Sequence, residues 1–129
     1  DGALDVARAN ARRLGLAVSF TRADLLEGAP DADAILSNPP YVAEADRAAL
    51  APEITRHEPE LALFAGADGL DVVRRLAAQA GASPARFVAV EIGSGQAPAV
   101  AALLHGAGFS ATEARRDLAG IDRVVIGRR

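Results

Sequence analysis

The chain has 129 residues, of which 50% are apolar and 24% charged, and this composition predicts one globular domain with a real core rather than a disordered segment. Its net charge of −3 gives no general electrostatic attraction to polyanions, so a nucleic acid is not the expected partner. It has no cysteine, which excludes disulfides, thiolate chemistry and cysteine-ligated metals, and no stretch resembles a signal peptide or an apolar membrane span, so we expect a cytoplasmic protein that does not contact a membrane.

The first segment of the chain predicts a helix, because apolar residues recur at helical spacing from Leu4 to Leu14 and Gly15 follows as a stop signal. Residues 17–21 then predict a short strand, and residues 24–27 lead into a loop. The helical pattern starts with the first residues and without a methionine, so we expect the sequence to be a piece of a longer chain.

The middle of the chain predicts one strand and one helix. Residues 34–37 form a short apolar run that ends at two adjacent prolines. Residues 43–67 contain further prolines and predict a loop with a short helix. Asp68 is the expected N-cap of a helix whose apolar face ends at Gly81.

The C-terminal part predicts strands at 87–92, 110–115 and 123–126 and a helix at 97–107. Strands that alternate with helices, and apolar runs of this length, indicate an α/β sheet covered on both faces. The last two strands are joined only by residues 117–122, and so short a connection requires an antiparallel pair.

The corner Asn38-Pro-Pro-Tyr41 is the main candidate site, because ligands of open α/β sheets sit beyond the carboxyl ends of strands. Asn38 offers a side-chain carbonyl acceptor, Pro39 a backbone carbonyl, and Tyr41 a flat ring. These groups are suited to holding a planar –NH₂ group and directing its nitrogen lone pair at an electrophile. The alternative is a rigid turn at the strand end. An aromatic residue directly after the prolines favours the functional interpretation.

This corner resembles the signature of S-adenosylmethionine-dependent amino methyltransferases, which methylate exocyclic amines of bases or the amide of glutamine. Other parts of the chain resemble the HemK/PrmC-type release factor glutamine methyltransferases, and the resemblance runs essentially from end to end. The segments that carry it are Arg56 to Leu63, Gly66 to Asp71, Glu91 to Gly93 with Gln96, and Asp117 to Val125.

The resemblance implies an enzyme that transfers a methyl group from S-adenosylmethionine to the side-chain amide nitrogen (N5) of a glutamine. In this family the glutamine belongs to the Gly-Gly-Gln motif of peptide chain release factors. Asn38 and Pro39 would be the catalytic residues and hold the glutamine amide, and Pro40 and Tyr41 would shape its slot.

For the cosubstrate, the resemblance points to Asp24 and Leu25, which follow the preceding strand where the family lines the adenine pocket, and to Asn38. A turn or a helix cap is the alternative for Asp24. No metal is implied. We do not assign His57 and Glu58 as a base, because an amide nitrogen that attacks a sulfonium methyl can lose its proton afterwards.

The fold implied by the resemblance is a Rossmann-like class I methyltransferase sheet with an antiparallel C-terminal strand pair, in the strand order 3-2-1-4-5-7-6. The chain would supply strands 3 to 7 and lack the first two, so that residues 1–129 would be part of one catalytic domain. Because the family's glycine-rich loop would lie upstream, we expect this piece alone to be inactive and to bind the cosubstrate weakly.

Three alternatives remain. The segment Glu91-Ile-Gly-Ser-Gly95 resembles a glycine-rich cofactor loop, and with Glu113 as a ribose-binding acid it would indicate a permuted DNA methyltransferase; we interpret it as a tight strand-to-helix turn. An amino methyltransferase acting on DNA or RNA bases would need a basic face, and the arginines do not cluster beyond pairs. The third alternative is a truncated, non-catalytic interaction module.

Overall fold

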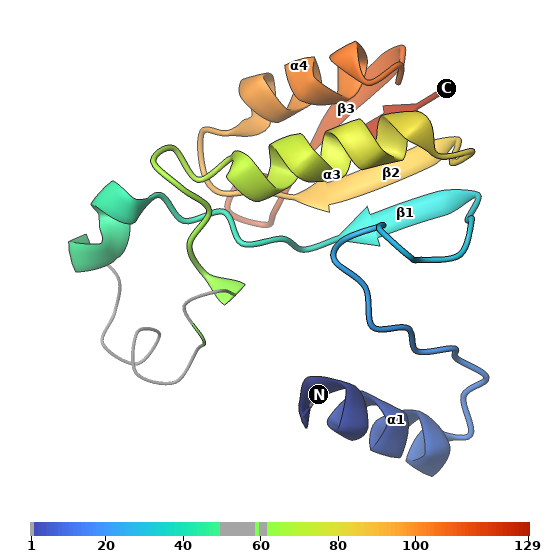
Figure 1. Cartoon of the computed structure of the whole chain (residues 1–129). Helices are drawn as coiled ribbons and strands as arrows, with labels where there is room; N and C mark the ends of the chain where they lie inside the picture. Colours follow the sequence, from blue (N-terminus) through green and yellow to red (C-terminus); the bar gives the residue numbers. More distant parts are fainter. Residues whose placement is uncertain (1, 50–58, 60–61) are drawn as a thin grey trace. The chain divides into compact units, whose positions relative to one another are not determined.

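The computed structural model describes residues 2–49, 59 and 62–129 (Figure 1). The chain forms two compact units, an N-terminal unit, Asp1–Pro30, and a sheet unit, Asp31–Arg129. The elements are, in chain order, α1 (Gly2–Leu14), β1 (Ala34–Ser37), the 3-10 helix η1 (Glu44–Ala49), α3 (Asp71–Ala82), β2 (Phe87–Glu91), α4 (Ala97–Gly106), β3 (Ala111–Arg116) and β4 (Asp122–Arg128). No helix in this described part is long and apolar enough to cross a membrane.

The first helix, α1, is confirmed together with its glycine stop. Gly15 has a φ of 65°, in the left-handed region that a residue with a Cβ avoids. The N–H of Gly15 donates to the carbonyl of Arg12 at 3.2 Å, and the N–H of Leu16 donates to that of Ala11 at 2.9 Å. These two bonds form a Schellman cap, which satisfies carbonyls that the helix end leaves without partners.

The prediction of a strand at residues 17–21 is wrong. These residues carry no regular secondary structure, and Val18 is 53% exposed. A strand is maintained by hydrogen bonds to a neighbouring strand, and no described strand pairs with this segment. Its alternation of apolar and polar residues is therefore not sufficient to make it a strand in this chain.

The sheet has the order β1-β2-β4-β3. Strands β1 and β2 are parallel, with Ile35 opposite Val88, and β4 is antiparallel to both of its neighbours. The antiparallel C-terminal pair is confirmed. The observed order is also the 4-5-7-6 part of the expected methyltransferase sheet, so the α/β fold class is confirmed.

Helices α3 and α4 pack on one face of this sheet (Figure 1). The core formed by the two helices and the sheet holds the largest fully buried side chains, namely Val73, Leu76, Val88, Val90, Ile92, Val100, Leu104, Phe109 and Val125. Burial of each such side chain contributes roughly 1.5–3 kcal/mol. Side chains alternate along a strand, so Leu36 lies on the opposite face from Ile35 and is 78% exposed. The expected cover on both faces is therefore found on one face only among the described residues of this unit.

Helix α3 begins later than the sequence predicts. The N-cap position is Leu70, not Asp68, and it makes no side-chain capping bond. Gly69, with a φ of 73°, interrupts the helical path between Asp68 and the helix. The Asp68 carboxylate instead accepts the N–H of Leu70 at 3.1 Å, which stabilises the turn before the helix.

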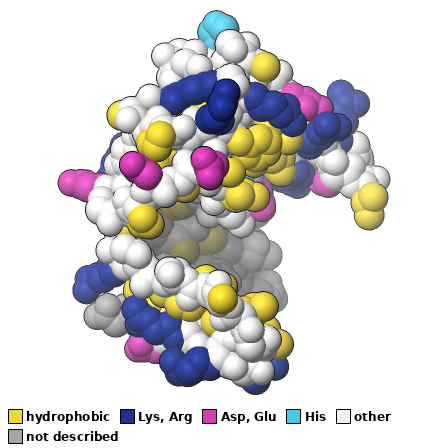
Figure 2. All heavy atoms as spheres, turned by 90° about the vertical axis from the view of Figure 1, so that its right-hand side faces the viewer, with side chains coloured by type: hydrophobic (Ala, Val, Ile, Leu, Met, Phe, Trp, Pro, Cys, Tyr) yellow, Lys and Arg dark blue, Asp and Glu magenta, His cyan; other side chains and the backbone are white. Residues whose placement is uncertain are grey.

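At the amino end of β1 and β2, the side chain of Arg129 joins the last turns of the two helices. Its guanidinium donates to the carbonyls of Ala80 at 3.1 Å, Gly81 at 2.8 Å and Ser83 at 2.9 Å at the end of α3. At the end of α4 it donates to the carbonyl of Ala107 at 3.4 Å. It also lies 4.4 Å from the ring centroid of Phe109. Figure 2 looks at this side of the molecule and shows arginine side chains beside hydrophobic ones. A cation at helix C-termini interacts favourably with the partial negative charge there.

Candidate functional site

The corner Asn38–Tyr41 lies directly after β1, at the carboxyl end of the parallel pair. Pro39 is buried, while the Asn38 side chain is exposed. Among the described residues no hydrogen bond engages either the Asn38 side-chain amide or the Pro39 carbonyl. Two acceptors, one on a side chain and one on the backbone, are therefore available in consecutive residues.

The residue after the corner is fixed by a second segment of the chain. The N–H of Val42 donates to the carbonyl of Leu63 at 2.9 Å, and the N–H of Ala65 donates to the carbonyl of Val42 at 3.0 Å. These bonds form a short parallel bridge. A hollow of about 420 Å³ lies beside it and is lined by Asn38, Pro39, Pro40, Tyr41, Val42, Ala62 and Leu63.

The Gln96 side chain connects the corner to two loops. Its Nε2 donates to the carbonyl of Tyr41 at 3.0 Å, and its Oε1 accepts the N–H of Gly93 at 2.8 Å. The same Nε2 lies 3.4 Å from the carbonyl oxygen of Asp68 and 3.5 Å from that of Gly69. One neutral side chain thus joins the corner, the turn before α3 and the turn after β2.

Two glycines allow the loops to approach this closely. A Cβ placed on Gly69 would collide with the carbonyl oxygen of Tyr41. A Cβ on Gly93 would lie 3.0 Å from Oε1 of Gln96 and 3.2 Å from Cδ2 of Tyr41. Gly69 therefore requires a residue without a side chain, because its backbone lies against that of Tyr41, whereas a side chain at Gly93 would press on the side chains of Gln96 and Tyr41.

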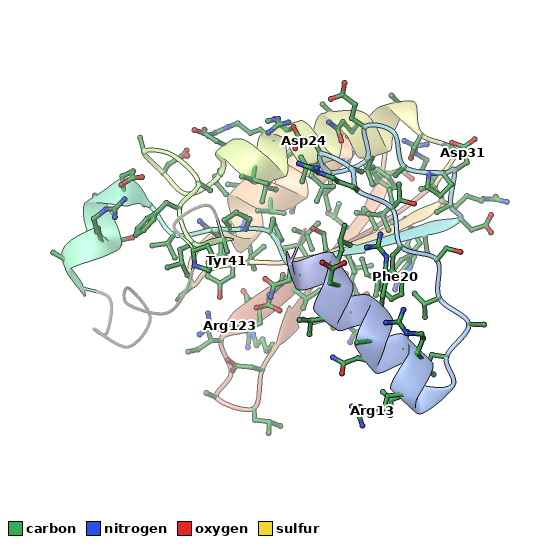
Figure 3. All side chains as sticks on the ribbon, turned by 60° about the horizontal axis from the view of Figure 1, so that its bottom comes forward. Arg13, Phe20, Asp24, Asp31, Tyr41 and Arg123 are labelled. Atoms are coloured by element: carbon green, nitrogen blue, oxygen red, sulfur yellow. The ribbon has the colours of Figure 1, made fainter. Side chains whose placement is uncertain are left out.

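A second hollow, of about 480 Å³, includes Tyr41, Asp68 and Arg123 in its lining. Tyr41 and Arg123 are labelled in Figure 3. Hydrogen bonds from the Arg74 guanidinium lower the pKa of the Asp68 carboxyl to about 2. Hydrogen bonds from the N–H of Ile121 and from Arg123 lower the pKa of the Asp117 carboxyl. Carboxylates with such low pKa values are poor proton acceptors at neutral pH, so neither is suited to act as a general base.

Asp24 and Leu25, the residues expected to bind the cosubstrate, lie in the N-terminal unit and form a tight turn. The N–H of Glu27 donates to the carbonyl of Asp24 at 3.1 Å, and Leu25 has a φ of 56°. A leucine in the left-handed region costs about 1–2 kcal/mol, so the turn holds an unfavourable conformation. The turn that was the alternative interpretation of Asp24 is present, and its role in binding stays a prediction.

The segment that resembles a glycine-rich cofactor loop is the turn from β2 to α4, and Gly95 has a φ of 82° within it. Glu113 lies within β3 and forms ion pairs with Arg115 and Arg128, away from any strand end. This geometry agrees with the interpretation as a strand-to-helix turn. His57 and Glu58 lie outside the described residues, and among the described residues no group of metal-ligating side chains lies together.

The sequence alone predicts no role for Gln96, Gly69 or Arg123. Gln96 was noted only as part of a family segment, and it lies 55 residues from the carbonyl it binds. A contact over such a distance leaves no local pattern in the sequence. The two glycines of the Gly66–Asp71 segment are the available signal, because a glycine often marks a turn or a close approach of two backbones.

Comparison with known proteins identifies close relatives. No protein-family model matches the chain. The release factor glutamine methyltransferase of Rhodospirillum rubrum is 48% identical over 133 residues, which cover 99% of this chain and 41% of that protein. The enzyme of the same name from Deinococcus radiodurans is 48% identical over 130 residues, covering 98% of this chain and 46% of that protein. The chain thus spans less than half the length of these relatives.

A solved structure supports the fold. The Mtq2–Trm112 complex of E. cuniculi, described as responsible for methylation of the translation termination factor eRF1, matches 93% of this chain and 68% of its own chain with a TM-score of 0.60. At 22% identity this likeness concerns the fold alone. The resemblance inferred from the residues is confirmed by the curated relatives: over nearly its whole length, this chain is similar in sequence to proteins named release factor glutamine methyltransferase.

Proposed function

We propose that the protein transfers a methyl group from S-adenosylmethionine to the side-chain amide nitrogen of a glutamine in a peptide chain release factor. The glutamine is that of the Gly-Gly-Gln motif, and residues 1–129 belong to the catalytic domain. The observation that carries this proposal is the pair of available acceptors, Asn38 Oδ1 and the Pro39 carbonyl, at the carboxyl end of β1. The names of the relatives support the same activity.

The two acceptors of the corner match the two hydrogens of a primary amide. An amide nitrogen is a weak nucleophile, because its lone pair is delocalised into the carbonyl group. When both N–H groups are held by acceptors, the nitrogen is drawn toward tetrahedral geometry and its lone pair gains a fixed direction. Orientation and electrostatic stabilisation by Asn38 and Pro39 then supply the catalysis. Pro40 and Tyr41 form the walls of the slot.

The lining of the hollow beside the corner fits a cationic methyl donor. S-adenosylmethionine supplies a methyl group on a positively charged sulfur. None of the described residues that line this hollow carries a positive charge, and the corner presents carbonyl oxygens to it. Asn38 would contact the cosubstrate from the sheet unit. Asp24 and Leu25 would bind its adenosine part, and the unfavourable backbone of Leu25 is of the kind found at ligand sites.

The transfer balances without a metal or a further reactant. The amide nitrogen forms a bond to the methyl carbon while the carbon–sulfur bond breaks and its electron pair goes to sulfur. The nitrogen then releases one proton to water. Because the proton leaves after the attack, no side chain with a raised pKa is required, in agreement with the low pKa values of Asp68 and Asp117.

The test uses the protein expressed from its complete reading frame, because the chain spans less than half the length of its relatives. It is incubated with methyl-labelled S-adenosylmethionine and with a release factor, the same factor with Gln→Ala in Gly-Gly-Gln, or unmethylated DNA. We expect label on the release factor and none on the variant. Label on DNA would instead mean that the corner holds a base, and no label on any substrate would contradict the enzymatic role.

A further inference from the structure

We propose that Gln96 is a positioning residue that sets the geometry of the amide-binding corner. The inference rests on the proposed function for its kinetic consequence, but its structural consequence is independent of the reaction. Gln96 lies at the N-cap of α4. In the part of the chain that the structure describes, no hydrogen bond joins it to Asn38 or Pro39. It acts on them through the carbonyl group of Tyr41.

The amide of Gln96 matches its surroundings atom by atom. Its oxygen faces a donor, the N–H of Gly93 at 2.8 Å. Its nitrogen faces backbone carbonyl oxygens only, at 3.0 Å for Tyr41, 3.4 Å for Asp68 and 3.5 Å for Gly69. Glutamine is the side chain of this length that carries both a donor and an acceptor in one neutral group.

A movement at Tyr41 is transmitted to the acceptors because the intervening backbone is stiff. Pro39 and Pro40 have their φ angles locked by their rings, so few torsions separate the Tyr41 carbonyl from the Pro39 carbonyl. On the other side, Val42 is fixed by its bonds to Leu63 and Ala65. A shift of the Tyr41 carbonyl is therefore expected to re-aim the corner rather than to be absorbed by a flexible loop.

Gln96→Glu tests this with almost no change in shape. It keeps the acceptor for the N–H of Gly93 but places a carboxylate oxygen against the carbonyl of Tyr41, where two oxygens repel each other. Gln79→Glu is the matched control, because it makes the same chemical change near the far end of α3. Gln79 lies eight residues, about 12 Å along the helix, from Asp71, where α3 begins after the turn that Gln96 contacts. Both variants are made in the protein expressed from its complete reading frame.

Three quantities are measured for each variant: the kinetic constants of methyl transfer, the thermal midpoint, and the ¹³C NMR resonances of the Tyr41 ring, assigned by their loss in Tyr41→Phe. For Gln96→Glu we expect kcat to fall by about 100-fold at temperatures where the variant is fully folded, with less than about a twofold change in KM for S-adenosylmethionine. We also expect the Tyr41 resonances to shift. Gln79→Glu is expected to leave kcat and these resonances unchanged.

Wild-type kcat and unshifted Tyr41 resonances in folded Gln96→Glu would overturn the inference, as would equal losses in both glutamate variants. If Gln96→Glu does not fold, Gln96→Met takes its place, with an expected loss of about tenfold in kcat and the same shift of Tyr41. A shifted Tyr41 in a protein whose wild type methylates no glutamine would support the positioning role and overturn the proposed function. Methylation of the glutamine by the wild type, together with wild-type kcat and Tyr41 resonances in Gln96→Glu, would support the proposed function and overturn the positioning role.

Discussion

At each end of the sheet unit, one side chain connects several backbone segments, and the two side chains differ in kind. At the carboxyl end of β1, the neutral Gln96 connects three loops, two of which approach Tyr41 closely, at Gly69 and at Gly93. At the opposite end, the charged Arg129 binds the carbonyls that end α3 and the ring of Phe109. The first end leaves two acceptors unoccupied among the described residues, whereas the second satisfies the carbonyls it meets.

This difference indicates a division of roles within one sheet. Arg129 lies over a fully buried part of the core, so its contacts are expected to contribute to folding. The Asn38 corner has an exposed side-chain amide and a buried Pro39 carbonyl that no described residue engages, so its contacts are expected to contribute to binding and turnover. Substitutions at the two ends should therefore separate activity from stability.

The largest effect is expected for Asn38→Ala. Loss of one acceptor that holds the reacting amide is expected to reduce kcat by about 100- to 1,000-fold, as for removal of one oriented polar group in other active sites. The thermal midpoint should remain unchanged, because the Asn38 side chain is exposed. Asn10→Ala, an exposed asparagine in α1, is the matched control. Steady-state kinetics and calorimetry provide both values, and equal losses in turnover and cosubstrate affinity would contradict the acceptor role.

Gly69→Ala is expected to be the most destabilising substitution at the carboxyl end. Its φ of 73° is unfavourable for alanine, and its new Cβ would collide with the Tyr41 carbonyl, so we expect a loss of at least about 2 kcal/mol in the free energy of unfolding. Gly95→Ala is the control, since Gly95 has a φ of 82° but no atom within 4 Å of the added Cβ. It should cost only about 1 kcal/mol. Equal losses in urea unfolding would show that contact with Tyr41 is unimportant.

Arg129→Ala tests the opposite end. It removes hydrogen bonds to helix-terminal carbonyls and the contact with Phe109, so we expect a loss of about 1–2 kcal/mol in stability and no change in kcat. Arg128→Ala removes an exposed ion pair with Glu113 at 3.2 Å and should cost less than about 1 kcal/mol. A reduced kcat in Arg129→Ala with an unchanged free energy of unfolding would contradict the distinction between the two ends.

The smallest effect concerns pH. The pKa of Asp68 is about 2 in the folded chain, below its ordinary value of 3.8, so its ion pair with Arg74 stabilises the fold above about pH 4. That contribution is lost as the pH falls from about 4 toward 2. Asp68→Asn should therefore lower the thermal midpoint at pH 6, and the difference from wild type should shrink near pH 2. A constant difference at all pH values would show that the charge of Asp68 plays no part.

Much of the fold was predictable because it depends on local patterns. The strands β1, β2 and β4 are runs of apolar and β-branched residues, and the C-terminal pair is antiparallel because its connection is short. The segment 17–21 has a similar pattern but no described partner strand. Whether a segment finds a partner strand depends on the tertiary structure and not on its own residues.

The site was predictable only where its chemistry lies in consecutive residues. The corner Asn38–Tyr41 was found because its four residues carry the acceptors and the ring together. Asp68 was misassigned as a helix cap because the left-handed turn at Gly69 delays the start of α3, and a sequence pattern does not show the direction of a turn. Gln96 binds the corner, and Arg123 lines the second hollow beside Tyr41, from distant segments, so their positions depend on the packing of the whole sheet unit.

The most direct test of the account is to locate the transferred methyl group by tandem mass spectrometry. A release factor is treated with S-adenosylmethionine and the protein expressed from its complete reading frame, then digested and sequenced. We expect methylation of the side-chain amide nitrogen of the glutamine in Gly-Gly-Gln, and none with the Asn38→Ala variant. A methyl group on any other residue, or an equal yield from Asn38→Ala, would contradict this expectation.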